Sequence, residues 1–209
     1  KMINSDVLKK LVKSGLCEVI MGIQSGSERV LHDVFHRYER QVDIIEATKI
    51  INDSGVFWKS YDFMLGHPFE TLDDLKESYY TIKKMEGTFE LQLHGLNFLP
   101  KTDIVNMAVE EGHYTEEEMK KIMFAPMKDQ FGTYWKRKRA GEYDLWYKMI
   151  YCSQFKWMRK TIGRFEDDPE KYKNEINRLY AWGNRMSCVR YYYKKIRVVL
   201  KRLRLVLLK

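Results

Sequence analysis

The sequence predicts an α/β fold in its first half, followed by an α-helical subdomain. Three short, mostly apolar segments predict strands at residues 17–23, 56–65 and 89–99. Helical patterns fill the intervals, and repeated β-α units of this length favour a parallel sheet, either a barrel or a doubly wound sheet. Three strands do not close a barrel, which needs about eight. After Gly112 the alternation ends and helix-like stretches rich in Lys, Arg, Glu, Trp and Tyr follow.

The helices can be placed in order from their periodicity and end signals. Residues 5–14 predict a first helix with Ser5 as its N-cap. Residues 40–54 are helix-periodic and precede a glycine. Thr71 with Asp74, and Thr115 with Glu118, have the spacing of helix capping boxes. We therefore expect a sheet unit over residues 1–113, a helical subdomain over 114–189 and a separate terminal segment over 190–209.

The net charge of +8 comes from the terminal segment. Residues 190–209 contain eight Lys and Arg and no acid, which leaves 29 bases and 29 acids in residues 1–189. On a helical wheel, one stripe is basic and the opposite one is apolar. The basic stripe holds Arg190, Lys194, Arg197, Lys201 and Arg204, and the apolar stripe holds Tyr192, Ile196, Val199, Leu203 and Val206. Two interpretations remain open: a helix lying on an anionic membrane surface, or a final helix packed on the protein with its bases in water.

Several other functions find little support in the sequence. Cys17, Cys152 and Cys188 are widely spaced and form neither CxxC nor CxxxCxxC, so a disulfide framework and a cysteine metal site are not predicted. His32 and His36 have the spacing of a helical metal pair but no third ligand, which favours solvated helix residues. No RRM, KH or zinc-finger signature supports a nucleic-acid partner. With no secretory signal and no bilayer-spanning apolar run, we expect a cytoplasmic protein, with the basic helix as a peripheral membrane contact. Because it starts at Lys1, the chain is expected to be a piece of something longer.

Polar residues follow the first two predicted strands. In QSGSERVL, residues 24–31, Gly26 permits a sharp turn, and Ser25 with Glu28 has capping-box spacing. Backbone N–H groups at such a helix start can bind a carboxylate or phosphate. An ordinary strand-to-helix turn with a cap explains the same residues. YDFMLGHPFET, residues 61–71, repeats the arrangement at the next strand, which weakens the purely structural explanation for both.

These segments resemble a known family. MGIQSGSERVL, then YDFMLGHPFETLDDLKES about 40 residues later, then FELQLHGLNFLPKTDIVNMAVEEG, are similar to the second half of the catalytic barrel of radical S-adenosylmethionine enzymes. The resemblance is greatest to the branch that carries a cobalamin-binding domain before the barrel. It covers residues 5–113, about half of the chain, and implies strands four to six of a partial (β/α)6 TIM-like barrel.

The resemblance also implies site residues at the strand ends. The implied contacts to S-adenosylmethionine are Gln24, Ser25, Met64, Leu65 and Gly66. Weaker candidates for substrate contact are His67, Glu70, His94 and Asn97. For His94 and Asn97, polar residues on a strand surface satisfied by their neighbours are the competing interpretation.

The family's CxxxCxxC loop, which supplies three ligands to a [4Fe-4S] cluster, is absent from this sequence. The resemblance implies that the whole enzyme cleaves S-adenosylmethionine reductively to a 5′-deoxyadenosyl radical and uses cobalamin for methyl transfer or another radical step. This chain would then be catalytically incomplete and would need the amino-terminal half barrel as its partner, with a small-molecule or lipid-like substrate. The alternative is a non-catalytic binding module that attaches to anionic membrane or RNA through residues 190–209.

Overall fold

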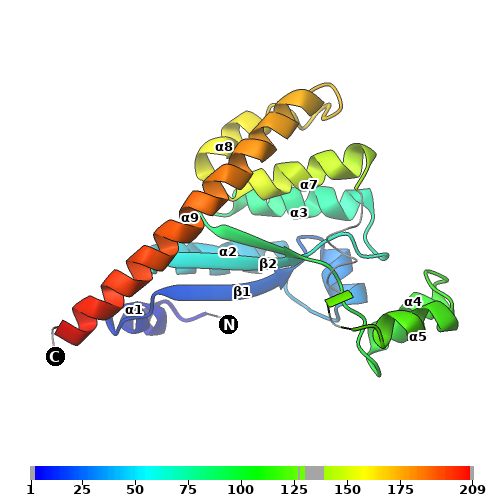
Figure 1. The fold of residues 1–209 in the computed structure, drawn as a ribbon, viewed down its shortest axis with the longest axis horizontal. Helices are drawn as coiled ribbons and strands as arrows, with labels where there is room; N and C mark the ends of the chain where they lie inside the picture. The colour runs from blue at the N-terminus through cyan, green and yellow to red at the C-terminus, as the bar shows by residue number, and fades with distance from the viewer. Residues whose placement is uncertain (1–2, 127, 130–138, 208–209) are drawn as a thin grey trace.

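The computed structural model describes residues 3–126, 128–129 and 139–207. It confirms a mixed α/β fold in which three parallel strands lie in the order β1-β2-β3 (Figure 1). The strands are β1 (Glu18–Gln24), β2 (Trp58–Met64) and β3 (Glu90–His94). The third strand is shorter than predicted, because the chain beyond Gly95 leaves the sheet and Phe98 packs into a second cluster.

Helices link the strands as the β-α pattern predicted. The π-helix η1 (Val30–Val34) and α2 (Gln41–Asp53) link β1 to β2, α3 (Leu72–Lys84) links β2 to β3, and α1 (Ser5–Lys13) precedes β1. The predicted N-cap Ser5 is wrong by one residue, since Asn4 Oδ1 accepts from the N–H groups of Asp6 and Val7. The predicted capping box of Thr71 and Asp74 is confirmed at the start of α3.

The first face of the sheet carries the main hydrophobic core. Ile23, Tyr61, Phe63, Leu91 and Leu93 alternate along the strands and are buried on this face. Helices α2 and α3 lie over it, and α7 (Gly141–Ser153) lies beside α3 (Figure 1). The core continues through Trp146 and Ile150 of α7, so these helices share their packing with the sheet.

A smaller cluster lies beyond the carboxyl ends of the strands. It joins η1 to α4 (Asp103–Glu110) and α5 (Glu116–Met123). Its buried members are Val30, Val34, Phe69, Phe98, Val105, Ala108 and Met119. The predicted capping box of Thr115 and Glu118 is confirmed at the start of α5.

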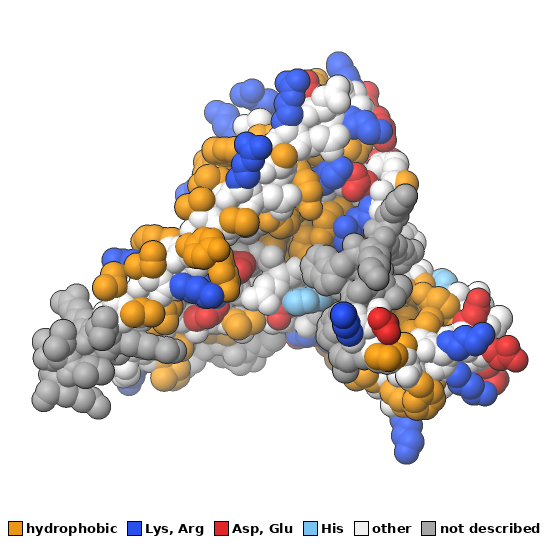
Figure 2. Space-filling view, viewed as in Figure 1, with side chains coloured by type: hydrophobic (Ala, Val, Ile, Leu, Met, Phe, Trp, Pro, Cys, Tyr) orange, Lys and Arg blue, Asp and Glu red, His pale blue; other side chains and the backbone are white. Residues whose placement is uncertain are grey.

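The remaining helices are α8 (Lys156–Ile162) and α9 (Lys173–Leu207). Helix α9 is continuous over 35 residues, so the terminal basic segment is its second half. In Figure 1, α9 runs from α7 and α8 past the amino-terminal ends of the strands. Figure 2 shows hydrophobic side chains along the arm that α9 forms. None of the helices described is long and apolar enough to span a bilayer.

Candidate functional site at the strand ends

The three strand ends meet at one edge of the sheet because the strands are parallel. Residues 24–27, 64–71 and 94–97 follow β1, β2 and β3, respectively. The second and third ends are joined directly, since the N–H of Leu65 donates to the carbonyl of His94 at 2.9 Å. The structure therefore brings all three predicted segments together, while their individual side chains point to different places.

The turn after β1 is packed tightly against α3. An added Cβ on Gly26 would lie 2.5 Å from Ser78 Cα, so this position requires a glycine. The N–H of Gly26 donates to Ser78 Oγ at 2.9 Å, and the N–H of Ser27 donates to Ser25 Oγ at 3.1 Å. Ser25 is fully buried within this junction.

These hydrogen bonds correct two predictions about the turn. Ser25 and Glu28 do not form a capping box, because the Glu28 carboxylate accepts from the N–H of Gln41 at 2.9 Å. The predicted anion site is also wrong for the N–H groups of Gly26 and Ser27, because both donate to side chains of the protein. The turn is therefore stabilised by hydrogen bonds to side chains of the protein itself.

A buried carboxylate, Asp74, joins the turns that follow β1 and β2. It accepts from Ser27 Oγ at 2.7 Å and Arg29 Nε at 3.1 Å. At the start of α3 it also accepts from the N–H of Thr71 at 2.8 Å and from Thr71 Oγ1 at 2.6 Å. Burial alone would raise the pKa of Asp74, but the hydrogen bonds from Arg29, Thr71 and Ser27 outweigh it and hold that pKa well below its usual range. The sequence indicated Asp74 only as a cap, and its link to Arg29 was missed.

The turn after β2 is held by Glu70. Gly66 has a φ of +72°, and its N–H donates to Glu70 Oε2 at 2.7 Å. Tyr143 Oη of α7 donates to the same oxygen at 2.6 Å. His67 is buried, with its ring centroid 5.4 Å from that of Phe35. Glu70 and His67, both predicted substrate contacts, therefore lie within the structure of the turn.

Gln24 occupies a strained position at the end of β1. Its φ is +74°, and the register with β2 shifts between Gly22 and Gln24. The side chain folds back over the strand, since an added Cβ on Gly22 would lie 2.6 Å from Gln24 Nε2. Gln24 Oε1 is buried and has no hydrogen-bond partner in the described part of the chain. An amide oxygen in this state lacks a hydrogen bond, which a donor group of a ligand would supply.

The second face of the sheet, opposite the main core, is polar near the strand ends. Asp62 pairs with Gly22 on one side and Gln92 on the other, so the three share this face with the Gln24 amide. Asp62 Oδ1 is also buried and lacks a partner among the described residues. Burial raises the pKa of Asp62, with His94 opposing and Glu90 adding to the shift.

The other predicted residues border this polar face. Met64 and His94 are paired at the ends of β2 and β3, where His94 is exposed and Met64 is half-buried. Leu65 is fully buried in the main core, so its side chain points away from the polar face. Asn97 is half-buried in the segment after β3.

Sequence reasoning missed Asp62 and Gln92, although a signal was present. In residues 60–63 and 90–94, polar side chains alternate with large, mostly apolar ones. That period of two places them together on the face opposite the core. The resulting site offers acceptor oxygens from Gln24 and Asp62, which suit a ligand that carries amino or hydroxyl groups.

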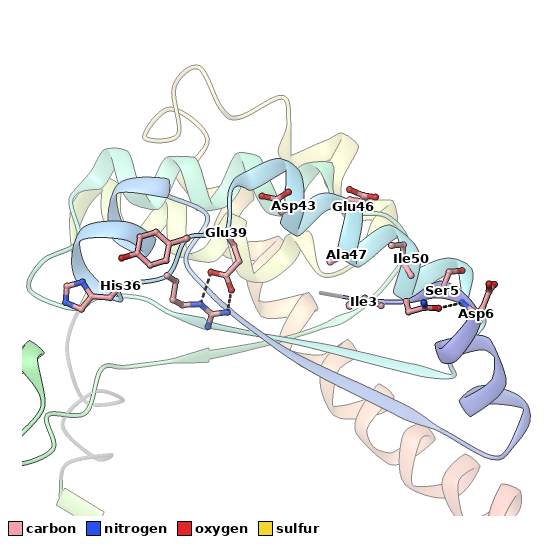
Figure 3. A pocket seen from close by; sticks show the side chains of 12 residues that line it. Ile3, Ser5, Asp6, His36, Glu39, Asp43, Glu46, Ala47 and Ile50 are labelled. Atoms are coloured by element: carbon pink, nitrogen blue, oxygen red, sulfur yellow. Dashed lines mark hydrogen bonds and ion pairs between the residues drawn. The ribbon is translucent and has the colours of Figure 1, made fainter. Parts of the chain in front are cut away.

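A cavity of about 1130 Å³ lies elsewhere, between the start of α1, residues 36–39 and α2 (Figure 3). Acidic side chains line much of it, and Glu39 is paired with Arg37 at 2.7 Å. His36 lines this cavity, whereas the His32 ring packs edge-on against Tyr38. Within residues 3–126, 128–129 and 139–207, no group of three or more His, Cys, Asp or Glu is arranged to hold a metal ion.

No protein-family model matches this chain, and neither does any curated protein. The functional interpretation therefore depends on the residues at the strand ends and on the resemblance of their sequences. Of those residues, Gln24 is the predicted contact whose side chain has a buried oxygen without a hydrogen-bond partner among the described residues.

Proposed function

We propose that this chain is the carboxyl-terminal part of a radical S-adenosylmethionine enzyme and supplies strands four to six of a partial (β/α)6 barrel. The observation that carries the proposal is Gln24 Oε1 at the end of β1, which is buried and has no hydrogen-bond partner among the described residues. It stands on the polar face of three parallel strands, which in a barrel would face the interior.

The chemistry of the site fits S-adenosylmethionine. That ligand carries an ammonium group and ribose hydroxyls, all of them hydrogen-bond donors, and Gln24 and Asp62 offer acceptors. The Met64–Gly66 segment supplies the neighbouring wall for the adenine. Ser25 acts indirectly in this scheme, since its hydroxyl fixes the turn that places Gln24.

Cleavage of S-adenosylmethionine to methionine and a 5′-deoxyadenosyl radical needs one electron, which a reduced [4Fe-4S] cluster supplies when bound. The cysteines of this chain do not fit such a cluster. Cys17 precedes β1 at the far end of the sheet, Cys152 is buried in α7, and Cys188 lies on α9. The cluster ligands are therefore assigned to the amino-terminal half barrel. The use of cobalamin stays a prediction from the resemblance.

The open edge of β1 is consistent with an amino-terminal half barrel beside it. Val7 and Leu11 of α1, the helix that precedes β1, are large apolar residues, each about half exposed. In the described residues β1 pairs with β2 on one side, so its other edge is open. A further β-α unit would cover these side chains and pair that edge.

The test begins with the parent reading frame, which must encode CxxxCxxC before Lys1. Full-length protein, reconstituted and reduced without oxygen, should release 5′-deoxyadenosine. Gln24→Ala should weaken S-adenosylmethionine binding about tenfold, as expected for one buried hydrogen bond to a charged donor. Asn106→Ala, which removes an exposed amide on α4, is the matched control.

A parent frame without that motif, or no 5′-deoxyadenosine from cluster-loaded protein, would overturn the proposal and favour a non-catalytic module. If cleavage occurs but Gln24→Ala binds as tightly as the unchanged protein, the enzyme assignment stands and the role of Gln24 is wrong. Cluster content and the unfolding midpoint should be equal in both variants.

A further inference from the structure

In the part of the chain that the structure describes, helix α9 is covered on one side. Its first half packs on α7, where Ile176 is buried in the main core and Gly183 lies close to Cys152. Its second half crosses the amino-terminal ends of the strands. There, one face of the helix is turned toward the sheet and the opposite face is turned away from it. A helix on a protein surface usually turns its apolar face toward the protein, and in α9 the apolar face is turned away.

The face turned toward the sheet is basic. Lys194 pairs with the carboxylates of Glu18 and Glu90, at the start of β1 and β3. Arg190 lies over the Trp58 ring, with its guanidinium carbon 5.1 Å from the ring centroid. Burial lowers the pKa of Arg190, as expected for a cation enclosed by the protein. Arg190 and Lys194 are therefore occupied within the molecule, which corrects the expectation of water-exposed bases for these two members of the stripe, whereas Arg197 is exposed.

The face turned away from the sheet is apolar. It holds Val189, Tyr192, Ile196, Val199 and Leu200, each at least half exposed. The exposed fraction is 65% for Tyr192 and 60% for Ile196. Spacings of three and four residues place them on one stripe, and the hydrophobic arm in Figure 2 includes this part of the molecule. An exposed stripe of this kind marks an interaction surface.

We propose that this outer face of α9 binds the surface of a bilayer containing anionic lipids. The aliphatic side chains would enter the lipid interface, and the remaining bases would contact lipid phosphates. Lys195 is exposed beside the stripe, and Lys201, Arg202, Arg204 and Lys209 follow in a sequence that has no acid from residue 190 onward.

A second copy of the chain fits the same stripe less well. The three-four spacing suits a coiled-coil seam. Pairing two such helices, however, would bring together two segments that contain no acid and that each carry six bases besides Arg190 and Lys194. An anionic surface removes that repulsion.

RNA would also neutralise the charge, but Tyr192 is the one member of the stripe that offers an aromatic ring for stacking on bases, and the other four members are aliphatic. Apolar and basic chemistry together favour lipid. This inference is independent of the proposed enzyme activity, because it rests on α9 alone.

The experiment is flotation of the full chain with phosphatidylcholine vesicles, with or without about one third phosphatidylglycerol. We expect recovery with the anionic vesicles and little with the neutral ones, falling as salt rises. Ile196→Asp with Val199→Asp should lower the recovered fraction at least tenfold. Phe124→Asp changes an apolar residue after α5 that is even more exposed, at 73%, and should leave the recovered fraction unchanged.

Lys194→Gln separates the two faces of the helix. It removes a base that pairs with Glu18 and Glu90, so it should lower the unfolding midpoint while leaving flotation within twofold. Unchanged recovery of the Ile196 and Val199 double variant would overturn the proposal. So would a dimer in sedimentation that this double variant disrupts, or salt-sensitive RNA binding in place of vesicle binding. Circular dichroism of each variant must match that of the unchanged chain.

Discussion

The carboxylate of Asp74 offers a direct test of how the strand ends are held. Asp74→Asn keeps the size of the side chain and removes its charge. The native carboxylate is about 5% exposed and accepts hydrogen bonds from Ser27, Arg29 and Thr71. An amide at this place turns one NH₂ group toward at least one of these donors, so part of the network must break.

The loss can be worked out from those contacts. A hydrogen bond to a charged group contributes about 1.5–3 kcal/mol. The Arg29 side chain is 45% exposed, so solvent screens its share, and most of the loss falls on Ser27 and Thr71. We expect Asp74→Asn to lower the free energy of unfolding by about 2–3 kcal/mol at pH 7. Urea denaturation followed by tryptophan fluorescence measures it.

The pH dependence gives the same prediction a second readout. Because the folded pKa of Asp74 is lowered, its contribution is complete above the unfolded value of about 4 and is lost as the pH falls toward the folded value. The difference between the native chain and Asp74→Asn should therefore shrink between pH 5 and about pH 3. Asp73→Asn, an exposed carboxylate in the same first turn of α3, should cost about 0.5 kcal/mol. Equal stability of the two variants, or a difference that does not change with pH, would refute the reasoning.

Three further predictions concern the core. Gly26→Ala forces a methyl group to within 2.5 Å of Ser78 Cα and should lower the free energy of unfolding in urea by about 2–3 kcal/mol. Tyr61→Phe removes a buried hydroxyl that has no partner among the described residues. In urea, the free energy of unfolding should stay the same or rise by about 1 kcal/mol. A fall of more than about 1 kcal/mol would contradict this prediction. Burial raises the pKa of the Cys152 thiol to about 12, so a disulfide reagent at pH 8 should label exposed Cys188 first, and Cys152 should react only on unfolding.

The parts of the fold that could be predicted from the sequence are those with local causes. The strands at residues 17–23 and 56–65 and the capping boxes at Thr71 and Thr115 depend on neighbouring residues, and they are found within a residue or two of their expected places. The third strand was predicted too long because its apolar run continues past His94. Those last apolar residues pack in the cluster around α4 and α5. The hydrophobic pattern alone does not show whether an apolar residue packs in that cluster or belongs to a strand of the sheet.

The candidate site shows the same division between local and distant causes. The segments at the strand ends could be located, because turns and caps have recognisable residues. The side chains that face the open surface could not be predicted, because Ser25 is buried against Ser78 and Glu70 accepts a hydrogen bond from Tyr143. Both partners lie more than 50 residues away in the sequence. A side chain that is buried by a distant element looks, in the sequence, the same as one that is free to bind.

The orientation of helix α9 also depends on residues that are distant in the sequence. Its two stripes follow from spacing alone, but which one faces the protein depends on where acids stand in the folded sheet. Glu18 and Glu90, far apart in the sequence, lie together at the amino-terminal ends of β1 and β3 and attract Lys194. Because this pairing turns the basic stripe inward, the apolar stripe must face outward. The same ion pairs that attach the helix to the sheet thus create the exposed surface for which a partner is required.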